Sequence, residues 1–169
     1  MRTRTEALAL FDRLPAVPVD AMRGTWRGEG FHTCHPLDGL LEACHWHGKR
    51  FDDPEHVQPL VFDTLFGGTV AVRPVGVRLG IALVLRLPVL KSRAVGRLVQ
   101  AVLPLLATRR SQARLRMLES RGRSSATIVY DNLPINDALR QLDADSVLGM
   151  MDLKGLPQPL FFVLRRERG

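Results

Sequence analysis

Apolar and polar residues alternate along many short segments of the chain, which is typical of half-buried β-strands. The clearest alternation runs from Met22 to Gly30, where Trp26 shares one side with glycines while charged and polar side chains share the other. The glycines around Trp26 leave room for another strand or helix to cross close to the backbone. We therefore predict that Trp26 is a buried structural plug at one end of a sheet that closes into a barrel.

Further short strands are predicted at 46–51, 57–62, 69–72, 75–79, 113–117, 126–130, 146–152 and 160–166. Pro74 interrupts the alternation, which suggests an edge or a bulge there. A turn at 120–123 joins two of the segments into a hairpin, and the last two segments form another.

Helical spacing of apolar residues interrupts this pattern in four places. It predicts an N-terminal helix after Thr5 over 5–14, a short helix at 36–45, an amphipathic helix at 88–105 and a short helical excursion at 135–142. No internal repeat or low-complexity linker is present. The expected architecture is mainly β, a single domain over 1–169 that forms one antiparallel barrel with these helical additions.

The chain has 169 residues and 46% apolar content, enough to bury a core without metal or disulfide staples. It has only two cysteines, and its first residues lack the pattern of a secretory signal. The longest apolar runs fall short of the roughly 20 residues needed to cross a bilayer. We expect a cytoplasmic protein that is soluble or peripheral to the membrane.

The net charge of +7 is concentrated in the second half. Residues 1–80 carry nine Lys or Arg against ten Asp or Glu, whereas residues 81–169 carry fifteen against seven. Such an excess attracts anionic partners. We expect the apolar face of the helix at 88–105, which includes Val95, Leu98, Val99, Val102 and Leu103, to pack on the barrel, and contact with an anionic lipid surface is the secondary interpretation. Nucleic acid is disfavoured because residues 86–123 contain no aromatic side chain to stack on bases.

Two groups of residues match known sequence signatures. The first comprises Gly24-Thr25-Trp26-Arg27-Gly28 followed by Trp46, Gly48, Lys49 and Phe51, and the second comprises Tyr130-Asp131, Pro134-Ile135, Asp137, Gly149, Met151-Asp152 and Lys154. The first resembles the bacterial GXWXG proteins over about residues 6–66, and the second resembles their DUF4334 module over about residues 110–166. This resemblance implies no activity.

The Trp26 segment also looks like the first strand of the calycins, namely lipocalins, fatty-acid-binding proteins and haem-binding nitrobindins. This likeness implies an arginine over the indole as part of the plug, and Arg165 or Arg166 stands where it is expected. Nitrobindins bind haem through a histidine late in the chain. All five histidines here (His32, His35, His45, His47 and His56) lie in the first third, so we predict no haem bound in that way. No other cofactor is predicted.

The side chains with metal-binding chemistry gather at Cys34, His35, Cys44 and His47. Their spacing matches neither paired CxxC motifs nor a Cys2His2 finger. Cys44 also falls on the leucine face of its predicted helix, where a thiol packs as a small hydrophobe. We therefore assign no metal site.

The leading functional hypothesis is non-enzymatic binding of a small hydrophobic or amphipathic molecule, such as a fatty-acyl or lipid-like ligand, inside the barrel. The ligand-binding candidates are Trp46, Lys49, Met117, Ile128, Tyr130, Asp131, Asp137, Asp152 and Lys154. Met150, Met151, Phe161 and Phe162 are further lining candidates.

Two alternatives remain open. One is an enzyme acting on a small hydrophobic substrate with Asp131, Asp137, Asp152 and Lys154 as acid-base groups, although the aspartates also suit ordinary turns and caps. The other is a peripheral membrane or protein-interaction module that uses the basic half. Binding is favoured over catalysis, no catalytic residue is assigned, and the sequence predicts no oligomeric state.

Overall fold

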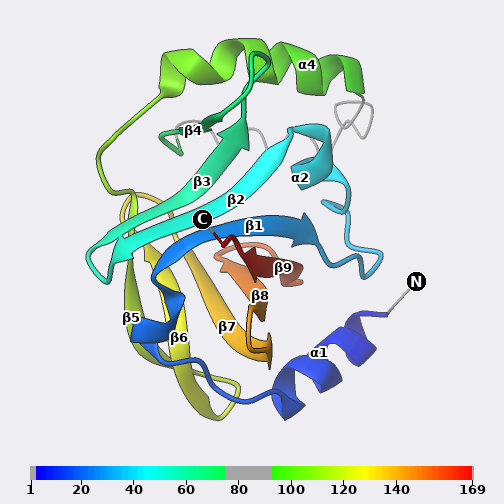
Figure 1. The fold of residues 1–169 in the computed structure, drawn as a ribbon. Helices are drawn as coiled ribbons and strands as arrows, with labels where there is room; N and C mark the ends of the chain where they lie inside the picture. The colour runs from blue at the N-terminus through cyan, green and yellow to red at the C-terminus, as the bar shows by residue number, and fades with distance from the viewer. Residues whose placement is uncertain (1–2, 75–92, 169) are drawn as a thin grey trace.

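The computed structural model describes residues 3–74 and 93–168, whose strands form one antiparallel sheet (Figure 1). The strands are β1 (Gly24–Gly30), β2 (Trp46–Asp53), β3 (His56–Asp63), β4 (Thr69–Ala71), β5 (Ala113–Ser120), β6 (Arg123–Tyr130), β7 (Ile135–Asp143), β8 (Ser146–Leu153) and β9 (Leu160–Arg166). Their order is β2-β1-β9-β8-β7-β6-β5-β3-β4. Because β2 also pairs with β3, eight strands close into a ring and β4 extends from β3. The predicted mainly β architecture with helical additions is confirmed.

The N-terminal helix α1 (Arg4–Arg13) covers the outer face of the sheet. It begins one residue before the predicted start at Thr5, because Thr3 and Glu6 form a reciprocal capping box at its N-terminus. Phe11 of α1 packs edge-on against Phe161 of β9, with 6.3 Å between ring centroids. A short 3-10 helix, η1 (Val19–Met22), follows before β1.

The predicted helix at 36–45 is present as the shorter α2 (Leu40–Ala43). The predicted amphipathic helix corresponds to α4 (Arg93–Val102) followed by the 3-10 helix η3 (Leu103–Leu106). Its first part, 88–92, and the predicted strand at 75–79 lie outside the described residues. Among the helices of the described ranges, none is long and apolar enough to cross a membrane.

The side of the amphipathic helix that faces the barrel differs from the prediction. We expected its apolar face to pack on the barrel. Leu103 does pack in the main core, but Leu98 and Val102 are exposed while Gln100 is buried. A Cβ at Gly96 would lie 1.8 Å from the carbonyl oxygen of Ala43, so the helix approaches α2 along its glycine. Gly96 thus lies on the side of the helix that contacts α2, whereas Leu98 and Val102 are exposed.

The prediction of a helical excursion at 135–142 is wrong. This segment is strand β7, which pairs with β6 and with β8 over most of its length. Ile135 and Leu139 contribute to the main core inside the barrel, and Asp137 occupies the position between them. A polar residue at an interior position hides the alternation that identifies a strand.

The core is divided between the barrel interior and the layer beneath α1. The interior cluster includes Trp26, Trp46, Ile128, Tyr130 and Phe162. Met150 and Phe161 instead pack beneath α1 with Ala7 and Phe11, so the prediction that they line the interior is wrong. Alternation places neighbouring residues of β8 and β9 on opposite faces of the sheet.

Candidate functional site

A buried ion pair lies inside the barrel. The ammonium nitrogen Nζ of Lys49 is 2.8 Å from Oδ2 of Asp137, and these two side chains are 3% and 1% exposed. Lys49 also donates to the Tyr130 hydroxyl at 3.1 Å and to the Pro59 carbonyl oxygen at 3.2 Å. The Tyr130 hydroxyl in turn donates to Asp137 Oδ2 at 3.2 Å.

Strand pairing explains why residues so distant in sequence meet here. Lys49 of β2 stands opposite Trp26 of β1, and Asp137 of β7 stands opposite Ile128 of β6. The register of β2 and β3 shifts between the pairs Gly48–Val61 and Arg50–Gln58, so Pro59 falls within an irregular part of the ladder. The sequence did not identify the Pro59 carbonyl as a partner of Lys49. The feature that could have indicated it is a proline within an apolar strand segment, which marks an irregular ladder.

Aromatic rings surround the Lys49 ammonium. Nζ lies 4.9 Å from the ring centroid of Phe162 and 5.5 Å from those of Trp46 and Tyr130. Cations are attracted to the faces of such rings, more strongly where water is excluded. The cluster therefore combines charge, hydrogen bonding and aromatic surface in the buried interior of the barrel.

Two buried polar atoms of this region have no hydrogen-bond partner in the structure, namely Asp137 Oδ1 and Trp46 Nε1. An unpaired buried polar group costs about 1–3 kcal/mol, more when it is charged. One of these atoms accepts hydrogen bonds and the other donates them. The cluster and the ring beside it thus leave one buried acceptor and one buried donor without a partner.

Tyr130 is held in its neutral form. Burial, together with the neighbouring Asp137 carboxylate, raises the pKa of Tyr130 well above its ordinary value. The phenol therefore remains protonated at neutral pH and serves as a hydrogen-bond donor.

Trp46 separates the buried cluster from the surface. It lines a surface pocket of about 500 Å³ together with Gly28, Glu42, His45 and residues of β9 and its C-terminal extension. The same side chain packs edge-on against Phe162 inside the barrel, with 5.8 Å between ring centroids. Trp46 therefore lies between this pocket and the interior cluster and contributes to both.

The remaining ligand candidates lie at different places. Ile128 is buried in the interior, whereas Met117 is half exposed on β5. Asp131 is exposed near Arg114, and Lys154 is exposed in the turn after β8. The structure thus brings Trp46, Lys49, Ile128, Tyr130 and Asp137 together and leaves the other four candidates outside.

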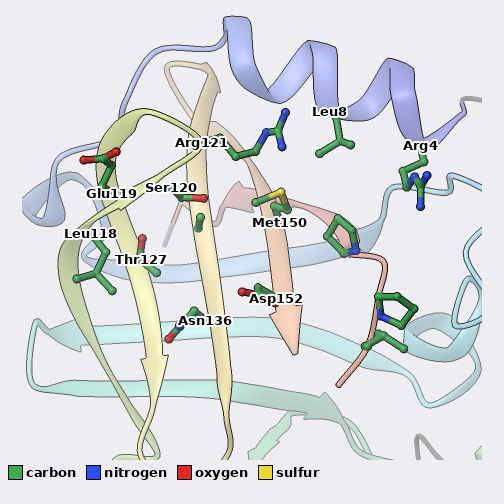
Figure 2. Close-up of a pocket in the computed structure, with 14 residues that line it drawn as sticks. Arg4, Leu8, Leu118, Glu119, Ser120, Arg121, Thr127, Asn136, Met150 and Asp152 are labelled. Carbon is green, nitrogen blue, oxygen red and sulfur yellow. The ribbon is translucent and has the colours of Figure 1, made fainter. Parts of the chain in front are cut away.

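Asp152 lines a separate groove of about 460 Å³ on the outer face of the sheet. Figure 2 shows it beside Asn136 and Met150, with Arg4 and Leu8 of α1 across the groove. Asp137 faces the interior instead, so the four groups proposed for acid-base chemistry do not form one site. This spatial separation weakens the enzymatic alternative.

The plug at the Trp26 end uses one of the two candidate arginines. The guanidinium carbon of Arg166 lies 4.3 Å from the Trp26 ring centroid, and Arg166 Nη1 donates to the Arg23 carbonyl oxygen. The Trp26 indole donates to the Met22 carbonyl oxygen at 2.7 Å. Arg165 lies on the surface and pairs with Glu29, so it is not part of the plug.

The four weak metal candidates are dispersed. Cys34 is exposed, Cys44 packs against the interior core, and burial raises the pKa of its thiol. His35 Nδ1 accepts from the Leu37 amide, while His47 lies between Asp63 and Glu167. Within residues 3–74 and 93–168, no group of three or more such side chains is placed to hold a metal.

The fold and the site define a class of protein, an antiparallel β-barrel with a charged and aromatic cluster in its interior. Residues 9–67 match the family model described as GXWXG protein, and residues 111–166 match the domain of unknown function DUF4334. The chain belongs to this GXWXG and DUF4334 family.

A solved structure is similar over most of the chain. The crystal structure of a protein from Thermomonospora curvata is similar with a TM-score of 0.72 and 35% sequence identity, over 98% of this chain and 88% of that one. Among curated proteins, no match was found.

Proposed function

We propose that the protein binds a small, mainly apolar molecule inside its barrel and holds the polar group of that molecule at the cluster of Lys49, Tyr130 and Asp137. The observation that carries this proposal is the open oxygen of a buried carboxylate, Asp137 Oδ1. Removing a charged pair from water is costly, and a purely structural core is often as stable with apolar residues in its place. Packing alone does not require a buried ion pair, whereas binding the polar group of a ligand would use one.

The hydrogen-bond inventory favours an uncharged polar group on the ligand. An ammonium has three protons, and Lys49 has three acceptors in Pro59, Tyr130 and Asp137. A ligand carboxylate would find no free proton on Lys49 and would face the open oxygen of Asp137. A hydroxyl or amide can instead donate to Asp137 Oδ1 and accept from Trp46 Nε1. Among lipid-like ligands, an alcohol or amide is therefore favoured over a fatty acid.

The apolar part of the ligand would pack among the rings that surround Lys49, namely those of Trp46, Tyr130 and Phe162. Access would come from the pocket beside Gly28, past the Trp46 side chain. Binding would then require a movement of Trp46, which makes that residue both a contact and a gate.

Calorimetric titration with octanol and octanoate tests the proposal. Octanol should bind more tightly, because octanoate brings a second anion to Asp137. Trp46→Phe keeps an aromatic ring but removes the indole donor, and should weaken octanol binding about 2- to 10-fold, the value of one hydrogen bond. Trp26→Phe is the matched control, since that indole already donates to Met22.

Equal affinity for the two probes would contradict the head-group assignment. Absence of binding by octanol and by other alcohols and amides of similar size would contradict the proposed function itself. If both tryptophan substitutions weakened octanol binding equally, the loss of affinity would reflect a less stable fold rather than a lost contact at Trp46.

A further inference from the structure

An exposed apolar patch lies at the α4 end of the barrel. Phe66 is fully exposed at 100% and Leu105 is 82% exposed. The complete set, called here the end patch, is Leu65, Phe66, Leu98, Val102 and Leu105. Large apolar side chains grouped on a surface mark sites of interaction with other molecules.

Contacts between the elements hold these side chains in one region. The Gln100 amide of α4 donates to the Asp63 carbonyl oxygen at 3.1 Å, just before the turn that carries Leu65 and Phe66. The Arg73 amide donates to the Leu106 carbonyl oxygen at 3.0 Å, which ties the strand after that turn to η3. Figure 1 shows α4 lying across the end of the barrel next to the turn between β3 and β4.

The stretch of sequence that carries the end patch is strongly basic. Between Asp63 and Glu119 the sequence contains ten Lys or Arg and no Asp or Glu. Arg73, Arg97, Arg109 and Arg110 are exposed and form no ion pair with another described residue. Elsewhere on the described surface, exposed arginines such as Arg121 and Arg165 are paired with carboxylates.

We propose that the end patch docks the protein on an anionic membrane surface, with the apolar side chains entering the headgroup region and the arginines contacting lipid phosphates. Apolar groups with flanking cations are the combination that peripheral helices use, and each cation near an anionic surface contributes about 1 kcal/mol. Phe66 and Leu65 stand on a tight turn closed by Gly67 and Gly68, both at positive φ. A protruding turn of this kind fits a deformable lipid surface better than a flat protein surface.

Vesicle flotation tests this proposal with the full chain and vesicles of phosphatidylcholine, with and without phosphatidylglycerol. Binding should require the anionic lipid and should decrease with added salt. Phe66→Ser and Leu105→Ser should each reduce the partition coefficient about tenfold, because each removes an exposed apolar side chain that would enter the headgroup region. Arg97→Ala and Arg109→Ala should each reduce it about fivefold.

Met117→Ser is the matched control, because Met117 is an exposed apolar residue on β5 outside the end patch. It should leave the partition coefficient unchanged. Absence of binding to anionic vesicles, or binding that Phe66→Ser and Leu105→Ser leave intact, would overturn the proposal. So would sedimentation showing a wild-type oligomer that Phe66→Ser dissociates, because the end patch would then be an interface between protein chains.

Discussion

Gly28 leaves the space that the Trp46 ring occupies, because a Cβ at Gly28 would lie 2.1 Å from Cζ3 of that ring. The second glycine of the motif around Trp26 therefore makes room for the other tryptophan of the chain. The first glycine, Gly24, has a positive φ of 117° and lies near Arg166, which covers Trp26. The motif thus connects the structural plug at Trp26 to the candidate ligand site at Trp46.

Gly28→Ala should destabilise the protein by about 1–3 kcal/mol, because the added methyl group overpacks the core and displaces the Trp46 ring. Thermal unfolding measures this change. Gly30→Ala on the same strand is the matched control, since its Cβ would meet the flexible end of the Glu42 side chain at 2.4 Å. Gly28→Ala should cost less in a Trp46→Leu background than in the wild-type protein, because the indole that it would displace is absent. Equal costs for both glycine substitutions would contradict this account.

Arg166→Ala should lower the stability of the barrel, whereas Arg165→Ala should change it little. Arg166 combines a cation-π contact worth about 0.5–2 kcal/mol with hydrogen bonds to two backbone carbonyl groups. Arg165 forms an exposed pair with Glu29, and such pairs contribute about 0–1 kcal/mol. Chemical denaturation of the two variants compares these contributions directly. The reverse order would show that Arg166 does not hold the plug.

Substitutions of Lys49 and Asp137 should change the free energy of unfolding in a strongly non-additive way. Lys49→Met and Asp137→Leu alone should each cost about 3–5 kcal/mol, because each leaves the other charge buried without its partner. The double variant should cost much less than the sum of the two and should no longer distinguish octanol from octanoate. A double-mutant cycle by chemical denaturation gives the coupling energy, and simple additivity would be inconsistent with the ion pair.

Tyr130 should resist ionisation until the protein unfolds in alkali. Its pKa is raised in the folded state, so its contribution to stability is fully present below its ordinary pKa of about 10 and is lost as the pH rises through the folded value. Tyr130 is the single tyrosine of the sequence, so tyrosinate absorbance reports on it alone. The absorbance should rise together with the loss of native circular dichroism, and an ordinary titration in the folded protein would contradict its burial beside Asp137.

The sequence predicts much of the fold because most strands keep a clear alternation of apolar and polar residues. The prediction fails at β7, where Asp137 of the interior cluster interrupts the alternation. It also fails in part for α4, which approaches α2 along Gly96 and leaves Leu98 and Val102 of its expected apolar face exposed. The local pattern of a segment does not predict contacts with residues that are distant in the sequence.

The candidate site shows the same limit. Trp46, Lys49, Tyr130 and Asp137 are all among the residues selected from the sequence, but nothing in their spacing distinguishes them from Asp152 or Lys154. Their meeting depends on closure of the ring and on the registers of β2 and β7. These are properties of the complete sheet rather than of any one segment.

The most direct test of ligand binding at the interior cluster is nuclear magnetic resonance of the two indole N–H groups during titration with octanol. The sequence contains two tryptophans, and only Trp46 Nε1 is buried without a hydrogen-bond partner, whereas Trp26 Nε1 donates to Met22. We predict a saturable shift of the Trp46 signal while the Trp26 signal stays in place. A titration in which the Trp46 signal does not move, or in which only the Trp26 signal moves, would contradict a ligand site beside Lys49 and Asp137.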